Sequence, residues 1–218
     1  MSLRTFKTSV YDQLARMGKT LANGSRLELL DLLAQSPRTV EKLANEIGQS
    51  VANTSHHLQV LRRAGMVART REGVSARYQL ADARVADLVR ALRVLAESQL
   101  AELGAIVSAF HRDNALSPSE RERLIDKVRL GEVTVVDVRP APEFDAGHLP
   151  GAVSIPLADL ERRIADIELT SEVVVYCRGP YCAMAAEAAD VLRAHGLAAR
   201  VLDEGVTDWR ARGFEIAK

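Results

Sequence analysis

The chain has 218 residues, enough for one large domain or two small ones. Its 29 basic and 29 acidic side chains cancel, and a hydrophobic content of 47% excludes a disordered chain. Two cysteines are too few for a disulfide scaffold or a four-cysteine zinc site, and no apolar run reaches the roughly 18 residues of a membrane span. The first residues lack the apolar core of a signal peptide, so we expect a cytoplasmic protein without membrane contact.

The neutral total conceals an asymmetry along the chain. Residues 1–112 carry 16 basic and 10 acidic side chains, whereas residues 113–218 carry 13 basic and 19 acidic ones. A basic half beside an acidic half indicates two domains. Residues 50–78 contain five arginines and a single acid, Glu72, which favours the binding of phosphates.

Helices dominate the first part of the chain. The spacing of apolar residues predicts them over residues 4–21, 26–35, 39–47 and 51–64. Ser25 and Ser50 are the expected caps of the second and fourth helices, and Gly48 and Gly65 are expected to end the third and fourth. Two short helices joined by a tight, glycine-containing turn make a helix-turn-helix unit.

A hairpin and a long helix follow. Strand-like runs within residues 66–80 flank residues 71–73 and predict a basic hairpin, which makes this half a winged helix-turn-helix. From Val85 to Phe110, apolar residues recur at steps of three and four and predict one helix of some 26 residues. An apolar stripe of that length packs on a helix of a second copy, on its own first helix, or on both through different faces.

The second half alternates strands with helices. After a linker at residues 113–117, a capping box at Ser117 and Glu120 starts a helix that ends before Gly131. Further strands are predicted at 133–138, 173–176 and 200–202, and further helices at 157–167, 183–194 and 206–212. This alternation indicates a mainly parallel sheet covered on both faces. The predicted fold class is a mainly α winged helix-turn-helix domain, residues 1–112, followed by an α/β domain, residues 118–218.

The helix predicted at 51–64 has two chemically different sides. A helical wheel places on its core side Val51, Thr54, Leu58 and Leu61. The opposite side carries Asn53, His56, Gln59 and Arg63. Amide, imidazole and guanidinium groups read base edges in a major groove. Arg62 and Arg63, with the hairpin arginines, are suited to phosphates and set the register. The candidate DNA-binding residues are Ser50, Asn53, Thr54, His56, His57, Gln59, Arg62, Arg63, Arg69, Arg71 and Arg77.

The run from Ser55 to Val67, with residues 71–73 and Tyr78, resembles the ArsR/SmtB family of bacterial repressors over roughly residues 10–112. The resemblance implies a homodimer, assembled through residues 4–21 and 82–112, that binds a double-stranded operator with two-fold symmetry. Many members sense metals through Cys or His ligands. This half has no cysteine, and adjacent positions such as His56 and His57 do not share a helix face, so we expect no metal site. A structural role for His57 and a DNA contact remain equally open.

Both cysteines lie between the strand that ends at Tyr176 and the helix that begins near Ala183. Cys177 directly follows the strand, at the sheet edge where α/β proteins bind ligands. Backbone N–H groups of the turn, the helix N-terminus and Arg178 favour a thiolate, so we expect a lowered pKa and a nucleophilic thiol at Cys177. Cys182 either attacks a modified Cys177 as a resolving thiol or packs as a small residue beneath the helix.

Motifs on both sides of this loop resemble the rhodanese family over about residues 118–218. They occupy residues 137–139, 143–152, 155–156 and 202–209, with Gly213. The resemblance implies that Cys177 accepts a sulfane sulfur as a persulfide, held by backbone amides of the loop. The candidate catalytic residues are Cys177, Arg178, Gly179, Tyr181, Cys182 and Ala183. The motif residues Asp137, Arg139, Glu143 and His148 are expected to be structural. Phosphatases and arsenate reductases of this fold need an arginine at the position of Ala183, which argues against both.

Three functions fit this pattern. The first is a cytoplasmic, homodimeric transcriptional regulator, a repressor, that senses reactive sulfur or an oxidant through Cys177, with no cofactor and no metal. The second is a thiosulfate-type sulfurtransferase whose DNA-binding half serves autoregulation. The third is a regulator whose rhodanese half is an inert interaction module. The small-molecule partner is a sulfur donor or an oxidant in the first case.

Overall fold

The computed structural model describes residues 2–72, 75–110, 115–167 and 172–218. Its contacts divide the chain into two compact units, Met1–Ala91 and Leu92–Lys218. Helix α5 (Arg84–Gln99) crosses this division. The domain boundary at residue 112 and the linker at 113–117 stay predictions, and residues 111–114 lie outside the described part of the chain.

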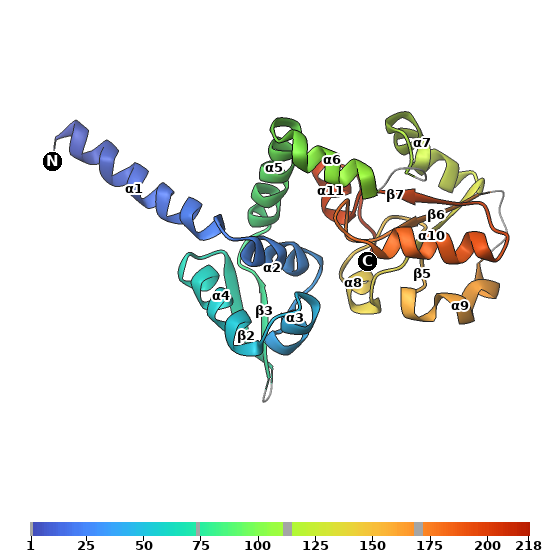
Figure 1. Cartoon of the computed structure of the whole chain (residues 1–218), viewed down its shortest axis with the longest axis horizontal. Coiled ribbons are helices and arrows are strands. Elements are labelled where there is room, and N and C mark those ends of the chain that lie inside the picture. Colours follow the sequence, from blue (N-terminus) through green and yellow to red (C-terminus); the bar gives the residue numbers. More distant parts are fainter. Residues whose placement is uncertain (1, 73–74, 111–114, 168–171) are drawn as a thin grey trace. The chain divides into compact units, whose positions relative to one another are not determined.

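The first unit combines a helix-turn-helix with an antiparallel sheet (Figure 1). Its elements before α5 are α1 (Leu3–Leu21), α2 (Gly24–Gln35), β1 (Arg38–Thr39), α3 (Val40–Glu46), α4 (Val51–Arg63), β2 (Val67–Glu72) and β3 (Ser75–Leu80). The strand order is β1-β3-β2, with both pairings antiparallel. The predicted winged helix-turn-helix is confirmed, and the tip of its hairpin, residues 73–74, lies outside the described part.

The helix starts follow the expected chemistry with one exception. Ser50 caps α4, because its hydroxyl accepts a hydrogen bond from the backbone N–H of Asn53 at 3.2 Å. The prediction that Ser25 caps α2 is wrong. Asn23 is the cap and accepts from the N–H of Arg26 at 3.1 Å, whereas the Ser25 hydroxyl accepts from the side chain of Gln49 at 2.6 Å. Asn23 therefore starts the helix, and the Ser25 hydroxyl is free to bond to Gln49 in the turn between α3 and α4.

The core of this unit holds α4 in place. Leu58 and Leu61 are fully buried, together with leucines of α2 and α3, and Val85 and Val89 of α5 pack against the same cluster. The prediction that Val51 faces the core is wrong, since it is 46% exposed. It is the first residue of α4 and lies before the turns that pack on the core.

The prediction of one continuous helix from Val85 to Phe110 is also wrong, because the structure has two helices there, α5 and α6 (Ala101–Phe110). Two features near the division weaken a continuous helix. The Ser98 hydroxyl donates to the carbonyl of Leu95 at 2.8 Å, and Gly104 follows in the next turn.

The second unit is an α/β sandwich (Figure 1). After α6, its elements are α7 (Pro118–Arg129), β4 (Val133–Asp137), α8 (Ala141–Ala146), β5 (Val153–Ser154), η1 (Leu157–Asp159), α9 (Leu160–Arg163), η2 (Ile164–Asp166), β6 (Glu172–Tyr176), α10 (Met184–Ala194), β7 (Ala199–Leu202) and α11 (Val206–Ala211). The strand order is β5-β4-β6-β7, all parallel, as predicted. The one helix predicted at 157–167 is instead a series of three short helices, the 3₁₀ helices η1 and η2 with α9 between them.

Strand β6 separates two apolar layers. Val173, Val175 and Cys177 point to the layer that contains the alanine face of α10, while Val174 and Tyr176 point to the layer around Trp209. Side chains alternate between the two faces of a strand, so the register of β6 directs the Cys177 sulfur into the α10 layer.

Candidate DNA-binding surface and cysteine loop

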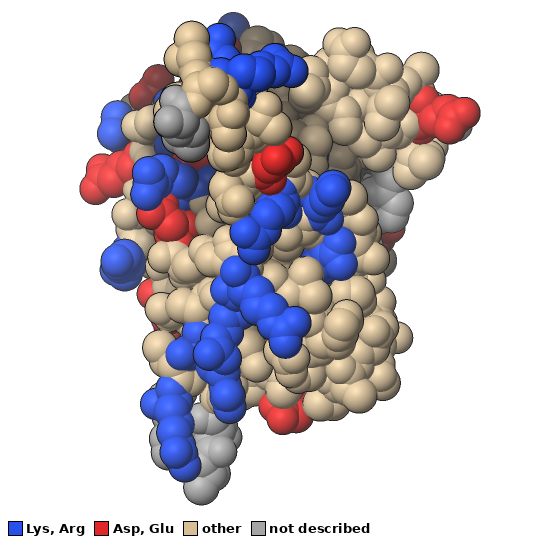
Figure 2. Space-filling model, turned by 90° about the vertical axis from the view of Figure 1, so that its left-hand side faces the viewer, with Lys and Arg blue, Asp and Glu red and all other residues tan. Residues whose placement is uncertain are grey.

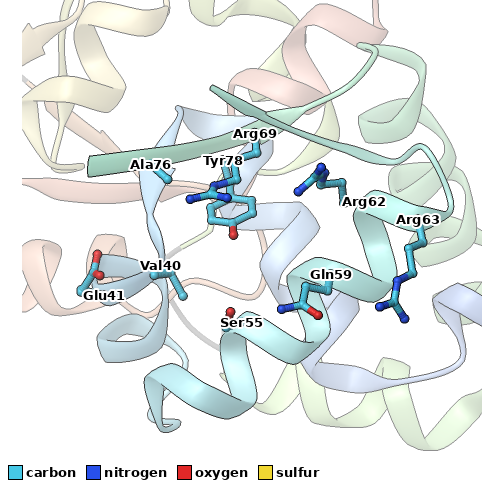
Figure 3. A pocket seen from close by; sticks show the side chains of 9 residues that line it. All are labelled: Val40, Glu41, Ser55, Gln59, Arg62, Arg63, Arg69, Ala76 and Tyr78. Atoms are coloured by element: carbon cyan, nitrogen blue, oxygen red, sulfur yellow. The ribbon is translucent and has the colours of Figure 1, made fainter. Parts of the chain in front are cut away.

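Helix α4 presents its polar side to solvent. The exposed side chains on it include Asn53, His56, Gln59, Arg62 and Arg63. A hollow of about 830 Å³ lies between α4, the start of α3 and the sheet (Figure 3). Its lining residues are Val40, Glu41, Ser55, Gln59, Arg62, Arg63, Arg69, Ala76 and Tyr78. The hollow therefore joins predicted base-reading and phosphate-binding side chains on one surface.

Basic side chains gather on this side of the molecule. Figure 2 shows a band of Lys and Arg with few acidic side chains beside it. Arg69 and Arg71 of β2 are exposed, and Arg77 of β3 is half-buried. An exposed cluster of guanidinium groups attracts the phosphates of a nucleic acid.

The candidate set needs one correction. Thr54 is fully buried, and its hydroxyl donates to the backbone carbonyl of Ser50 at 3.0 Å, so it cannot contact DNA. Ser50 itself is exposed at the cap. His57 is half-buried, and its pKa is lowered by burial and by the nearby charges of Arg26 and His56. A neutral, half-buried imidazole fits the structural alternative for His57 as well as it fits a DNA contact.

The cysteine loop connects β6 to α10. Cys177 is 2% exposed, whereas Cys182 is half-buried. The Cys177 thiol donates to the backbone carbonyl of Cys182 at 3.3 Å, and the Cys182 N–H donates to the carbonyl of Gly179 at 3.1 Å. The loop therefore folds back on itself and brings the Cys177 sulfur against the backbone of Cys182.

The two thiols differ in acidity, and not in the way the sequence predicts. The hydrogen bond to Cys182 and burial raise the pKa of Cys177 well above its usual range, against the opposing backbone hydrogen bonds from Gly179 and Ala185. The hydrogen bond from Cys177 lowers the pKa of Cys182 to about 6, helped by backbone hydrogen bonds from Met184 and Arg178 and by the Arg178 charge. The predicted lowering at Cys177 is thus wrong for this state, because the pair keeps one proton on the buried sulfur.

The other candidate loop residues have distinct positions. Arg178 forms an ion pair with Glu143, with its Nη2 atom 2.6 Å from Oε1, and Glu143 is 1% exposed. Gly179 has φ +141°, a conformation that L side chains rarely adopt. Tyr181 is 53% exposed, and Ala183 is exposed just before α10. The Arg178 side chain is therefore held by Glu143 of α8, while the side chains of Tyr181 and Ala183 face solvent.

The signature residues of the second half hold loops together, as expected. Asp137 and Arg139 are fully buried and paired at 2.6 Å, and Arg139 also donates to the carbonyl of Gly147. The ring of His148 stacks on Phe144 with 3.7 Å between centroids. These contacts lie within the protein and fix the loops on which the residues stand.

The described residues contain neither a candidate metal site nor a candidate membrane-spanning helix. Across residues 2–72, 75–110, 115–167 and 172–218, no three His, Cys, Asp or Glu side chains are grouped to hold a metal ion. Within the same ranges, no helix combines the length and apolar character that a membrane crossing needs.

Comparisons with known proteins support both halves. The family model for bacterial regulatory proteins of the arsR family matches residues 23–69, and the rhodanese-like domain model matches residues 118–212. Over 210 residues the chain is 41% identical to the HTH-type transcriptional regulator Rv0324 of Mycobacterium tuberculosis, covering 96% of this chain and 92% of that protein. The chain belongs to the ArsR-family regulators. It is a DNA-binding transcriptional regulator with a winged helix-turn-helix and a C-terminal rhodanese-like domain.

Other relatives match the first half of this ArsR-family regulator. The HTH-type transcriptional regulator CmtR of M. tuberculosis is 40% identical over 88 residues, which are 40% of this chain and 72% of CmtR. The homodimeric winged helix-turn-helix DNA-binding domain of Mb0332 from Mycobacterium bovis is 43% identical. It covers 46% of this chain and 91% of its own, with a TM-score of 0.43.

Sequence reasoning missed residues that border the cysteine loop. Gly205 packs against its backbone, and Arg93 and Asp208 lie beside Gly179. Asp208 falls in a motif quoted for the rhodanese resemblance, but neither its spacing nor that of Arg93 indicates that the two side chains meet.

Proposed function

We propose that this regulator is a homodimeric repressor that senses reactive sulfur or an oxidant through Cys177 and Cys182. The observation that carries the proposal is that both cysteines lie in one loop, where the buried Cys177 thiol donates to the backbone carbonyl of the half-buried Cys182 at 3.3 Å. The lowered pKa of Cys182 beside the raised pKa of Cys177 supports it. A transferase needs one such thiol, whereas a sensor gains a resolving thiol from the second.

The operator is a double-stranded site with two-fold symmetry. Asn53, His56 and Gln59 on the exposed side of α4 carry groups that read base edges, and Arg63 lies on the same side. Arg62 and Arg63, with Arg69, Arg71 and Arg77 of the hairpin, supply phosphate contacts that set the register.

Apolar side chains on exposed helix faces support a homodimer. The large apolar residues of α1 with at least two-fifths of their surface exposed are Leu3, Phe6, Val10, Tyr11, Leu14 and Met17. Those of α5 and α6, with the residue between them, are Leu88, Leu92, Val94, Leu95, Leu100 and Ile106. Helix faces of this kind are buried against another helix, and a second copy of the chain supplies matching faces.

The chemistry uses both sulfur atoms with an inorganic polysulfide as the donor. The Cys182 thiolate takes the proton of Cys177, and the resulting Cys177 thiolate attacks a sulfane sulfur. A bond forms between the two sulfurs, the next S–S bond breaks, and a polysulfide shorter by one sulfur leaves with the electron pair. Cys182 then attacks the Cys177 Sγ and expels hydrosulfide with its proton, which leaves a Cys177–Cys182 disulfide.

The test uses the full-length dimer and a duplex selected by the reduced protein from a randomised library. Sodium tetrasulfide should add sulfur to the Cys177 peptide or join it to Cys182, as seen by mass spectrometry, and should change the Kd for the duplex at least several-fold. Cys177→Ser should abolish both effects, and Cys182→Ser should stop at the persulfide. An unchanged Kd for modified wild-type protein would falsify sensing.

The rhodanese-like domain also favours a second function, sulfurtransferase activity through Cys177. A thiosulfate–cyanide assay on the wild type and on Cys177→Ser separates the two. Sustained thiocyanate production by the wild type, absent from Cys177→Ser, supports the enzyme. If the wild type shows no thiocyanate production and no sulfur addition, the result supports an inert interaction module.

A further inference from the structure

An ion pair borders the cysteine loop beside Gly179. Within the unit Leu92–Lys218, the Nη2 atom of Arg93 bonds to Oδ1 of Asp208, with side chains only 15% and 9% exposed. The other carboxylate oxygen of Asp208 accepts the backbone N–H of Gly205 at 3.1 Å. Asp208 therefore links Arg93 to the turn that precedes α11.

This turn and Arg93 both touch the cysteine loop. A Cβ atom on Gly205 would lie 2.1 Å from the carbonyl oxygen of Arg178, so the two backbones are in direct contact. A Cβ atom on Gly179 would lie 3.4 Å from Nη1 of Arg93 and 3.4 Å from Oδ2 of Asp208. The Arg93 guanidinium carbon is also 5.9 Å from the ring centroid of Tyr181. A rearrangement between Cys177 and Cys182 cannot move Gly179 or Tyr181 without altering these contacts.

Arg93 belongs to a helix that also serves the DNA-binding unit. Helix α5 begins at Arg84, and its Val85 and Val89 pack on the core that holds the recognition helix. Arg93 follows Val89 by four residues, about one turn, on the same continuous helix. A helix transmits a shift along its axis because its backbone hydrogen bonds resist bending.

We propose that Arg93 is the positioning residue that couples the chemical state of the Cys177–Cys182 loop to helix α5. This inference rests on the sulfur-sensing function proposed above and names its route. In the reduced state the Arg93–Asp208 pair fixes α5 against the loop. Joining or loading the two sulfurs displaces Gly179 and Tyr181, the contacts of the guanidinium change, and α5 shifts with them. The dimer then favours a second state, whose affinity for the duplex differs from that of the reduced state.

The experiment separates loading from coupling. Full-length wild type, Arg93→Gln, Arg93→Lys and Asp208→Asn are treated with sodium tetrasulfide, and each is assayed for sulfur on the Cys177 peptide and for Kd with the selected duplex before and after treatment. Arg162→Gln is the matched control, since it removes another Arg–Asp pair of this unit in which Arg162 is 77% exposed. Asp208→Asn keeps an oxygen for the Gly205 N–H and removes the charge, which guards against a folding defect.

The expected result is normal sulfur loading and a normal reduced-state Kd in Arg93→Gln and Asp208→Asn, with most of the fold-change in Kd lost. Arg93→Lys should recover part of it, and Arg162→Gln should respond like the wild type. A full response in Arg93→Gln overturns the inference. Loss of sulfur loading in both Arg93→Gln and Asp208→Asn also overturns it, because the pair then builds the loop itself. Failure of the proposed function is distinct, since the wild type would then lack loading or response.

Discussion

The recognition helix and the cysteine loop place their polar groups in opposite environments. On α4 the side chains suited to DNA are exposed, and the fully buried ones, such as Leu58, are apolar or bonded to backbone. Around the loop, the charged residues Asp137, Arg139 and Glu143 are almost completely buried, and the sulfur of Cys177 is buried with them.

The difference follows from what each region contacts. A DNA duplex is a large polyanion, so the groups that read it must project into solvent before it binds. The buried ion pairs of the second unit, Asp137–Arg139 and Glu143–Arg178, contact only protein and stabilise the loops that carry them. Substitutions of polar residues should therefore affect binding in the first unit and stability in the second.

The largest expected effect comes from the buried pair. Arg139→Met leaves the Asp137 carboxylate buried without its partner, and it should lower the free energy of unfolding by about 3–5 kcal/mol. The emission of Trp209, the single tryptophan and 1% exposed, monitors urea unfolding of this unit. Arg162→Met, in an exposed pair, should cost less than about 1 kcal/mol. Equal losses in the two variants would contradict the contrast.

Neighbouring residues of α4 provide a second test. Leu58→Ala empties fully buried volume and should lower stability by about 2–5 kcal/mol, measured by the loss of helical circular dichroism on heating. The Gln59 side chain is exposed, so Gln59→Ala should change the free energy of unfolding by less than about 0.5 kcal/mol. It should instead lose about 1–3 kcal/mol of discrimination between the selected duplex and single-base variants. A stable Leu58→Ala protein, or unchanged discrimination in Gln59→Ala, argues against this assignment of roles.

Local sequence signals predicted much of this architecture. The cap at Ser50, the capping box at Ser117 and Glu120, and the alternation of strands with helices all appear in the structure. Short elements such as α8 and β5 were missed, because six or two residues carry no measurable periodicity. The break at Leu100 was missed because the apolar spacing continues across it.

The environment of the cysteine loop was not predicted, because the expected exposed thiolate at Cys177 is a buried thiol with a raised pKa. Val173, Val175 and Cys177 alternate along the chain, so they point to the same face of the sheet. This pattern indicates that the Cys177 sulfur faces the layer that α10 covers. The prediction of a lowered pKa considered only the groups of the loop and did not use this pattern. The proximity of Arg93 to Asp208 joins positions 115 residues apart, so no local pattern indicates it. Thr54 was misassigned because its hydroxyl satisfies the helix backbone.

The acidity of Cys182 gives a pH-dependent test of the loop. A pKa of about 6 means that the thiolate predominates above pH 6 and is lost as the pH falls below it. Alkylation of Cys182 by iodoacetamide should therefore rise about ten-fold from pH 5 to pH 7 and then level off. Cys177, buried and with a raised pKa, should be labelled far more slowly. A labelling rate at Cys182 that still rises ten-fold from pH 7 to pH 8 would show an ordinary thiol.

The smallest effect concerns salt. Arg63 is exposed in the last turn of α4, and its removal in Arg63→Gln should leave stability unchanged. If it contacts one phosphate, the slope of log affinity against log salt concentration should become shallower by about 0.9, because fewer counterions are released on binding. Titrations of the selected duplex at several salt concentrations measure that slope. Arg129→Gln, 74% exposed in the second unit, should leave it unchanged, and a shift of equal size there would make the charge effect nonspecific.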